Sequence, residues 1–185
     1  MHGINFGNVN EELFQSQEET SRKVLRAQGR ERAADFLAAH PSALDRSVGV
    51  IGFCMGGMYA VLAACLCHGF AASGPFYGLL SYRHGMLARE LGLDPERKPH
   101  EPLAVAERLQ CPLLGFFGAE DALVPLADVR ELEAGFERSG RAHDVVVVEG
   151  AGHAFMNDTR PEAYREPQAR LAWRRMVGFL REQLA

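Results

Sequence analysis

The sequence contains no uninterrupted apolar run near the ~18–20 residues that a membrane-spanning helix needs. Its first residues also lack the basic stretch, apolar core and small-residue cleavage site of a secretory signal peptide. No basic block is present, because the arginines are spread among glutamates and the formal net charge is −4. These absences argue against a membrane protein and against a nucleic-acid-binding protein. They predict a cytoplasmic protein whose partner is a small molecule or another protein.

Cysteine is also scarce, with four residues and no Cys-x-x-Cys pair. Small secreted disulfide scaffolds are far denser in cysteine, so we expect reduced thiols. Cys65 and Cys67, with His68 beside them, resemble part of a soft-metal site, but they lie at the end of a predicted buried helix and lack a second ligand cluster. The sequence therefore predicts neither a disulfide framework nor a metal site.

What remains is a chain of 185 residues with 47% apolar content, enough for a single domain over residues 1–185. Short apolar runs predict four buried strands, at Val48–Phe53, 70–74, 113–117 and 145–148. Helical periodicity and capping signals predict helices at 16–40 with a break at Gly29, at 55–67, at 125–139, and at 161–184 opened by Pro161. A polar excursion with short helices is expected over 79–109. Strands alternating with helices are typical of an α/β fold with a parallel sheet covered on both faces.

A nucleophile-elbow pattern joins the first predicted strand to the helix after it. Residues 52–57 read Gly-Phe-Cys-Met-Gly-Gly, with cysteine in place of the usual serine. We expect Gly52 and Gly56 to stand where a Cβ would collide at the tight strand–helix crossing. The turn would place the Cys54 thiol at a helix N-terminus, where the helix dipole favours a thiolate, and aim the Met55 N–H at a developing oxyanion. An inert buried thiol is the competing interpretation of Cys54.

Two loops supply partners for this cysteine, each directly after a predicted strand. Asp121 follows the third strand and His153 follows the fourth. The order nucleophile, acid, histidine is that of α/β-hydrolases, and it favours a triad of Cys54, His153 and Asp121. Asp121 has a second interpretation as a helix N-cap, with Glu120 as a rival acid, and His153 has one as a simple loop histidine.

The class I glutamine amidotransferases also carry a cysteine elbow between a strand and a helix. They take their acid from a glutamate two residues after the histidine, and Phe155 stands at that position here. This difference disfavours the amidotransferases.

The chain resembles the dienelactone hydrolases (carboxymethylenebutenolidases) from about residue 13 to its C-terminus. The resemblance is carried by the elbow at 52–57, Phe-Tyr-Gly at 76–78, Gly-Ala-Glu-Asp at 118–121 and Gly-His-Ala-Phe at 152–155. It implies hydrolysis of an ester or enol-lactone through a thioester on Cys54, with His153 as general base and with no metal or organic cofactor. It also implies that the substrate contacts lie at Phe76, Tyr77, Phe155 and Asn157.

The chain departs from the family in two places. Family members carry a strand-rich segment before the matched region, with the first four strands of the sheet and a glutamate that helps to control the cysteine, and this chain begins after that segment. Val48–Phe53 would then form an exposed apolar edge, which residues 1–40, another chain, or polypeptide lost by truncation or a late start codon would have to cover. The family arginine that pairs with the substrate carboxylate is replaced by Asn157, which cannot form a bidentate charged contact. The sequence therefore leaves the identity of the substrate undetermined.

The sequence thus predicts a cysteine-dependent ester or lactone hydrolase with an α/β-hydrolase-type sheet that lacks the N-terminal strands. The expected partners are a small-molecule ester or lactone and a second copy of the chain that covers the edge at Val48–Phe53, with no nucleic acid and no membrane. The alternative is a truncated, hydrolase-like domain that folds by association and has no turnover.

Overall fold

The computed structural model describes residues 47–83 and 100–185 of the chain. The predicted helix at 16–40 and its break at Gly29 lie outside the described residues. None of the helices in the described part of the chain has both the length and the apolar character needed to cross a membrane.

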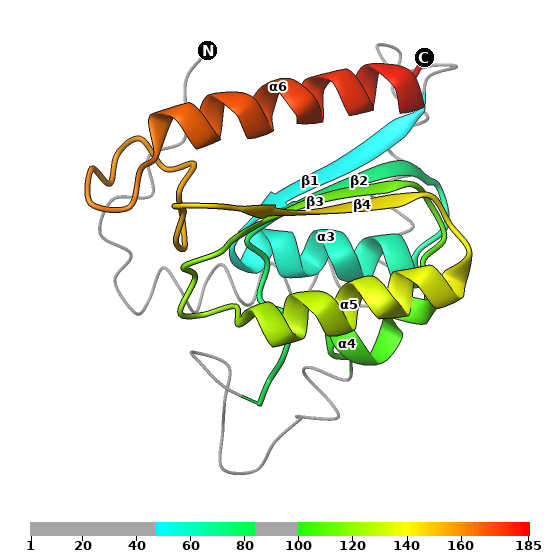
Figure 1. Cartoon of the computed structure of the whole chain (residues 1–185). Helices are drawn as coiled ribbons and strands as arrows, with labels where there is room; N and C mark the ends of the chain where they lie inside the picture. Colours follow the sequence, from blue (N-terminus) through cyan, green and yellow to red (C-terminus); the bar gives the residue numbers. More distant parts are fainter. Residues whose placement is uncertain (1–46, 84–99) are drawn as a thin grey trace, which may run out of the picture.

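The described chain forms a parallel sheet of four strands in the order β1-β2-β3-β4 (Figure 1). The strands are β1 (Val48–Phe53), β2 (Phe70–Phe76), β3 (Leu113–Gly118) and β4 (His143–Val148). The predicted parallel sheet is confirmed. Because all strands run the same way, the loops after them meet at one end of the sheet, where open α/β sheets bind their ligands.

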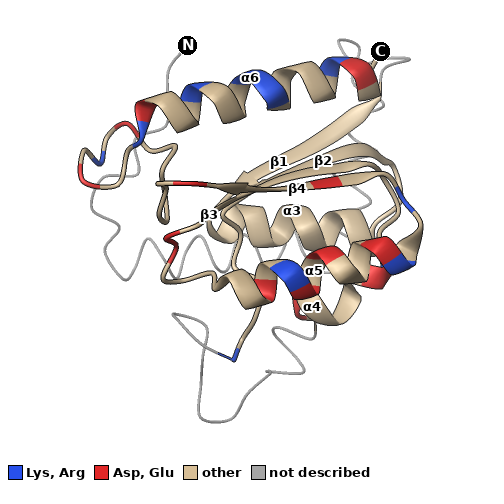
Figure 2. Cartoon of the chain, viewed as in Figure 1, with Lys and Arg blue, Asp and Glu red and all other residues tan. Residues whose placement is uncertain are grey.

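Helices cover both faces of this sheet, as predicted (Figure 1). On one face lie α3 (Met55–Leu66), α4 (Pro102–Val105), the 3-10 turn η2 (Ala106–Arg108) and α5 (Leu126–Ser139), and on the other lies α6 (Glu166–Gln183). A separate cluster of buried side chains fills each layer, with Val61 and Phe117 on the α3 side and Phe116 and Met176 on the α6 side. Charged residues are absent from β1 and α3, whereas α5 and α6 carry several (Figure 2), most of them exposed, with Asp128 of α5 buried.

The boundaries differ from the sequence prediction by two residues or more in three elements, and by one residue in α3, β3 and α5. β2 continues through Pro75, which keeps its register with β1, although a proline donates no ladder hydrogen bond. β4 begins at His143, two residues early, because its polar start packs against the helices: the His143 ring lies 5.8 Å from Phe136. The last helix does not open at Pro161. It begins at Glu166, with a proline in its first turn, and the residues before it form hydrogen-bonded turns.

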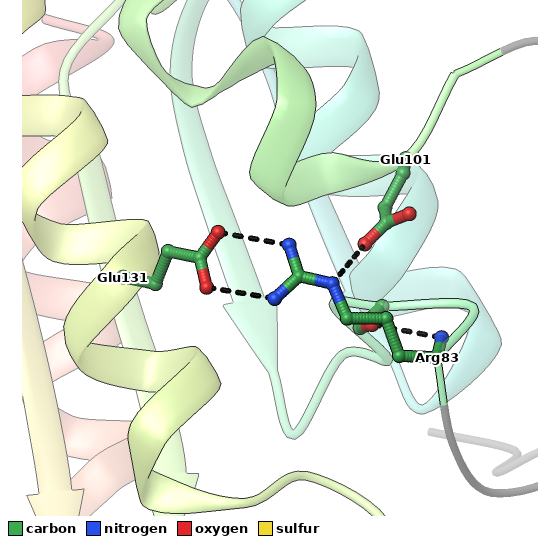
Figure 3. A network of polar contacts seen from close by, with 4 residues as sticks. Arg83, Glu101 and Glu131 are labelled. Carbon is green, nitrogen blue, oxygen red and sulfur yellow. Dashed lines mark hydrogen bonds and ion pairs between the residues drawn. The ribbon is translucent and has the colours of Figure 1, made fainter.

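Residues 79–109 were expected to form a polar excursion with short helices. Most of the side chains that the structure describes in this segment are buried in the core instead. Leu79, Leu80 and Tyr82 are buried, as are most residues of α4. Arg83 ties this segment to α5 through a bidentate pair with Glu131, both nitrogen–oxygen distances being 3.0 Å (Figure 3). Its Nε lies 3.8 Å from Oε1 of Glu101, the residue just before α4, so one guanidinium joins three parts of the chain.

β1 lies at the edge of the described sheet, where its one strand neighbour is β2. Its last residue, Phe53, is 42% exposed, while the side chains before it are partly buried. This edge agrees with the sequence analysis, and its coverage by a second copy stays a prediction.

Candidate active site

The turn between β1 and α3 has the geometry of a nucleophile elbow. Cys54 is the N-cap of α3, with φ 55° and ψ −118°, a backbone conformation that costs a non-glycine residue about 1–3 kcal/mol. Two backbone hydrogen bonds hold it there: the Cys54 N–H donates to the Phe76 carbonyl at 3.0 Å, and the Cys54 carbonyl accepts from Met58 N–H at 3.1 Å. The thiol is half-buried at the start of the helix.

The glycines around the elbow do not all serve the purpose expected of them. A Cβ on Gly52 would overlap the carbonyl of Gly56, so the strand–helix crossing requires this glycine. Gly56 itself is different, because an added Cβ would lie within 4 Å of nothing in residues 47–83 and 100–185 beyond its own helix and chain neighbours, and the prediction of a collision there is wrong. The second close approach involves Gly57, whose Cβ would lie 2.6 Å from the Phe76 carbonyl oxygen and 2.8 Å from the Gly78 Cα. The end of β2 therefore rests directly on the first turn of α3.

Three side chains from three loops meet beside this elbow. The His153 Nε2 lies 3.2 Å from the Cys54 Sγ, and the His153 Nδ1 lies 2.8 Å from the Asp121 Oδ2. The structure thus brings together the three residues that the sequence analysis proposed as nucleophile, base and acid, in the order of contacts expected of a triad. Both contacts are within hydrogen-bond range for the atoms involved.

Asp121 is held in place by its own loop. Its carboxylate is fully buried, and the Oδ1 that does not face His153 accepts hydrogen bonds from the backbone N–H groups of Leu123 at 2.8 Å and Val124 at 3.2 Å. The N-cap interpretation is wrong, because the N-cap of α5 is Pro125. The rival acid Glu120 is exposed, whereas Asp121 is the carboxylate that contacts His153.

The two donors to the Asp121 Oδ1 are functional groups that the sequence analysis missed. An aspartate that accepts from the N–H groups two and three residues later forms an Asx-type turn. The signal for this turn is present in the sequence as Asp-Ala-Leu-Val-Pro, an aspartate shortly before a proline-initiated helix.

Close backbone packing brings the histidine loop against the aspartate loop. A Cβ on Gly118, at the end of β3, would overlap the Ala151 carbonyl, and the Glu120 N–H donates to that same carbonyl at 2.9 Å. The residue after the histidine, Ala154, has φ 62°, so the backbone turns sharply directly after His153.

The environment of His153 favours its protonated form. Burial lowers the pKa of the imidazole, but the hydrogen bonds and charges of Asp121 and Cys54 outweigh burial and raise the pKa from 6.5 to about 9. At neutral pH the His153 side chain is therefore mainly the positively charged imidazolium, with a proton on each ring nitrogen. An imidazolium 3.2 Å from a sulfur atom stabilises negative charge on that sulfur.

A model of the dienelactone hydrolase family matches residues 7–184. The chain belongs to the dienelactone hydrolase family. Its relatives include a probable 2-oxo-3-(5-oxofuran-2-ylidene)propanoate lactonase from Bradyrhizobium sp., 31% identical over 88% of this chain and 60% of the relative. A putative carboxymethylenebutenolidase from Methylorubrum extorquens is 32% identical over 73% of this chain and 43% of the relative. The chain thus spans about half the length of these curated relatives.

Solved structures agree with this family assignment. A putative dienelactone hydrolase from Klebsiella pneumoniae subsp. pneumoniae superimposes with a TM-score of 0.73 and 25% identity, over 92% of this chain and 66% of that one. A dienelactone hydrolase-like promiscuous phosphotriesterase from metagenomic libraries shares the fold, with a TM-score of 0.67 and 22% identity, over 95% of this chain and 66% of that one. The α/β-hydrolase fold predicted from the sequence is confirmed.

The remaining residues that the elbow pattern and the family resemblance selected lie in different surroundings. Met55 is the first residue of α3, so its N–H belongs to the helical turn whose amide groups have no acceptor within the helix. Phe76 and Phe155 are 0% exposed within the core on the α6 side, which argues against direct substrate contact by either ring. Asn157 uses its Oδ1 to accept from the N–H and hydroxyl of Thr159, at 3.1 and 2.7 Å, and so stabilises its own turn.

The other three cysteines lie away from this chemistry. Cys65, Cys67 and Cys111 are all buried. Burial raises the pKa of Cys65 to about 12, with a further contribution from Cys111, and burial raises the pKa of Cys111 to about 11. Within residues 47–83 and 100–185, no group of three or more histidine, cysteine or carboxylate side chains is arranged to hold a metal ion.

Proposed function

We propose that this chain is a hydrolase that cleaves small esters or lactones through a thioester on Cys54. The observation that carries the proposal is the continuous contact from the Asp121 Oδ2 through both nitrogens of His153 to the Cys54 Sγ, at 2.8 and 3.2 Å. Membership of the dienelactone hydrolase family supports the same reaction class.

The first half of the reaction transfers the acyl group to sulfur. In the reactive form the thiol proton of Cys54 lies on the His153 Nε2, and the sulfur attacks the carbonyl carbon of the substrate. Negative charge develops on the carbonyl oxygen, where the Met55 N–H at the start of α3 serves as one donor. The imidazolium then gives its proton to the departing alkoxide or enolate, the C–O bond breaks, and a thioester remains on Cys54.

The second half restores the enzyme with water. His153 removes a proton from a water molecule as its oxygen attacks the thioester carbon. The C–S bond breaks, the carboxylic acid product leaves, and the proton held by the histidine is shared again with the sulfur. Asp121 fixes the ring orientation and stabilises the imidazolium.

The substrate class that we propose is a neutral activated ester or small lactone. Asn157 stands where the family arginine would pair with a substrate carboxylate, and its side-chain oxygen is engaged by Thr159. Arg160 is the nearest arginine in the sequence and lies exposed three residues further on. An uncharged substrate needs no such cation.

The test is hydrolysis of p-nitrophenyl acetate by the wild-type chain, Cys54→Ala, His153→Ala and Cys111→Ala. Removal of the nucleophile or base should lower kcat/KM on the order of 10²–10⁴-fold, the usual range for a positioned general base. Cys111→Ala is the matched control, because this buried thiol lies outside the site, and its kcat/KM should stay within about twofold of wild type. Full activity in Cys54→Ala would overturn the proposal.

One observation favours a second candidate, a hydrolase-like domain that folds by association and turns over little substrate. β1 has one strand neighbour in the described sheet, and its last residue, Phe53, is 42% exposed. An apolar edge of this kind promotes pairing with another chain. Light scattering should then show a homo-oligomer that Phe53→Ser weakens, whereas a wild-type monomer that hydrolyses ester efficiently would rule this candidate out.

A further inference from the structure

Backbone strain in the described chain is concentrated around the candidate active site. Among residues 47–83 and 100–185, three non-glycine residues have a positive φ: Cys54 at 55°, Tyr77 at 37° and Ala154 at 62°. Two of them belong to the machinery already described, as the proposed nucleophile and the neighbour of the proposed base. Such conformations persist where the surrounding structure enforces them, which is most common at functional sites. The third residue, Tyr77, has no role in the reaction as described so far.

The Tyr77 ring is packed against the histidine. Its centroid lies 5.2 Å from that of His153 with an interplanar angle of 65°, so the two rings meet edge to face. On another side the same ring meets Phe155 at 5.4 Å and 68°. Edge-to-face contacts at these separations are favourable and directional. Tyr77 therefore bounds the position that the imidazole can occupy.

Tyr77 is itself held firmly. It follows the last residue of β2, and its N–H donates to the Phe116 carbonyl on β3 at 2.7 Å. The next residue, Gly78, lies so close to α3 that a Cβ on it would come within 2.6 Å of the Met58 nitrogen. The tyrosine thus connects the ends of β2 and β3 to the histidine loop, and the residue after it packs against the elbow helix.

We propose that Tyr77 is a positioning residue for His153, whose ring keeps the imidazole in line between the Asp121 carboxylate and the Cys54 thiol. This inference rests on the proposed function. It replaces the role of substrate contact suggested by the family resemblance, because Tyr77 is only 3% exposed. Burial raises the pKa of the Tyr77 hydroxyl, with smaller contributions from the charges of Cys54 and Asp121, so the phenol beside the site stays neutral.

The experiment compares Tyr77→Phe and Tyr77→Leu with the wild-type chain by two measurements. The first is kcat and KM for p-nitrophenyl acetate, and the second is the rate at which iodoacetamide alkylates Cys54 at pH 7. Alkylation needs no substrate binding, but it depends on the thiolate that His153 stabilises. Tyr77→Phe keeps the ring, and Tyr77→Leu removes it. Phe136→Leu, on the buried face of α5, is the control for loss of a buried aromatic ring.

We expect Tyr77→Leu to lower kcat about 10- to 100-fold, the usual cost of misplacing a catalytic group by about 1 Å, with KM changed less than about twofold. The alkylation of Cys54 should slow as well. In Tyr77→Phe, kcat and the alkylation rate of Cys54 should both stay at the wild-type level. Phe136→Leu should likewise change neither quantity. If Tyr77→Leu does not fold, Tyr77→Met, which keeps more of the side-chain volume, takes its place with the same expectations.

Two results would overturn the positioning role. A higher KM with unchanged kcat and unchanged alkylation in Tyr77→Leu would show that the ring contacts substrate instead. An equal loss in Tyr77→Phe and Tyr77→Leu would show that the hydroxyl, and not the ring, is required. Because alkylation is independent of turnover, a chain without esterase activity would refute the proposed function while the effect of Tyr77 on Cys54 could still be measured.

Discussion

Cys54 should be by far the most reactive of the four thiols, because the other three are disfavoured by the fold itself. A thiolate is the reactive form of cysteine, and each increase of one in a thiol pKa lowers its thiolate fraction tenfold at neutral pH. With a pKa of about 11 in place of 9.0, Cys111 should carry a thiolate fraction about a hundredfold smaller than an ordinary cysteine. With a pKa of about 12, Cys65 should carry one about a thousandfold smaller.

Access adds to this difference. Cys65, Cys67 and Cys111 are 0%, 4% and 3% exposed, so a reagent reaches them only after local opening of the fold. Cys54 is half-buried at the N-terminus of α3, with the imidazole of His153 3.2 Å from its sulfur. Alkylation of Cys54 should therefore exceed that of any other cysteine by at least about 100-fold at pH 7.5.

The assay is limiting iodoacetamide followed by digestion and quantitative mass spectrometry of the four cysteine peptides. Labelling in urea is the control, because the unfolded chain should react nearly equally at all four positions. His153→Ala should slow the labelling of Cys54 and leave the others unchanged. Comparable labelling of Cys54 and Cys111 in the folded wild type would refute the reasoning, since it would mean that neither burial nor the histidine governs these thiols.

Three further predictions follow from the site geometry. Activity should fall as pH rises through about 9, because His153 must hold a proton for the leaving group and its pKa is about 9. Asp121→Asn removes a carboxylate that raises this pKa, so the alkaline limb of kcat/KM should move to lower pH, and an unmoved limb would contradict the pairing. Gly52→Ala should destabilise the fold by about 1–3 kcal/mol or more in urea unfolding, while Gly56→Ala should be neutral or stabilising, because only the first Cβ meets backbone. Asn157→Arg should raise kcat/KM for an anionic enol-lactone more than for p-nitrophenyl acetate, and a wild type that already prefers the anion, with no gain in the variant, would show that the pocket is assigned wrongly.

Local sequence signals were sufficient for the architecture. Apolar runs identified four strands and helical periodicity identified the helices between them, because each element is buried on the face that its pattern indicates. Element ends were harder, since tertiary packing decides them. Pro75 continues a strand that it would be expected to end, and Pro161 precedes the last helix without opening it. Pro75 shows a local rule giving way to pairing with a strand distant in sequence, whereas Pro161 lies among local hydrogen-bonded turns that precede the helix.

The order of Cys54, Asp121 and His153 along the chain was informative because parallel strands bring their following loops to one end of the sheet. What the sequence did not reveal is which side chains face that end. Phe76 and Phe155 flank the site in sequence, yet their rings turn into the core on the α6 side. A family pattern indicates which residues lie near a site in the sequence. The direction in which each side chain points depends on where the strands end and how the loops turn, and the structure is needed to see this.

The central claim is that an acyl group passes through Cys54, and the most direct measurement is to trap it. The wild-type chain is mixed with p-nitrophenyl acetate, quenched in acid during turnover, digested and examined by mass spectrometry, with formation and decay of the adduct compared with kcat. We expect an acetyl group on the Cys54 peptide, with rates of formation and decay at least as high as kcat. Turnover without an acyl group on Cys54, or with the acyl group on another residue, would contradict it.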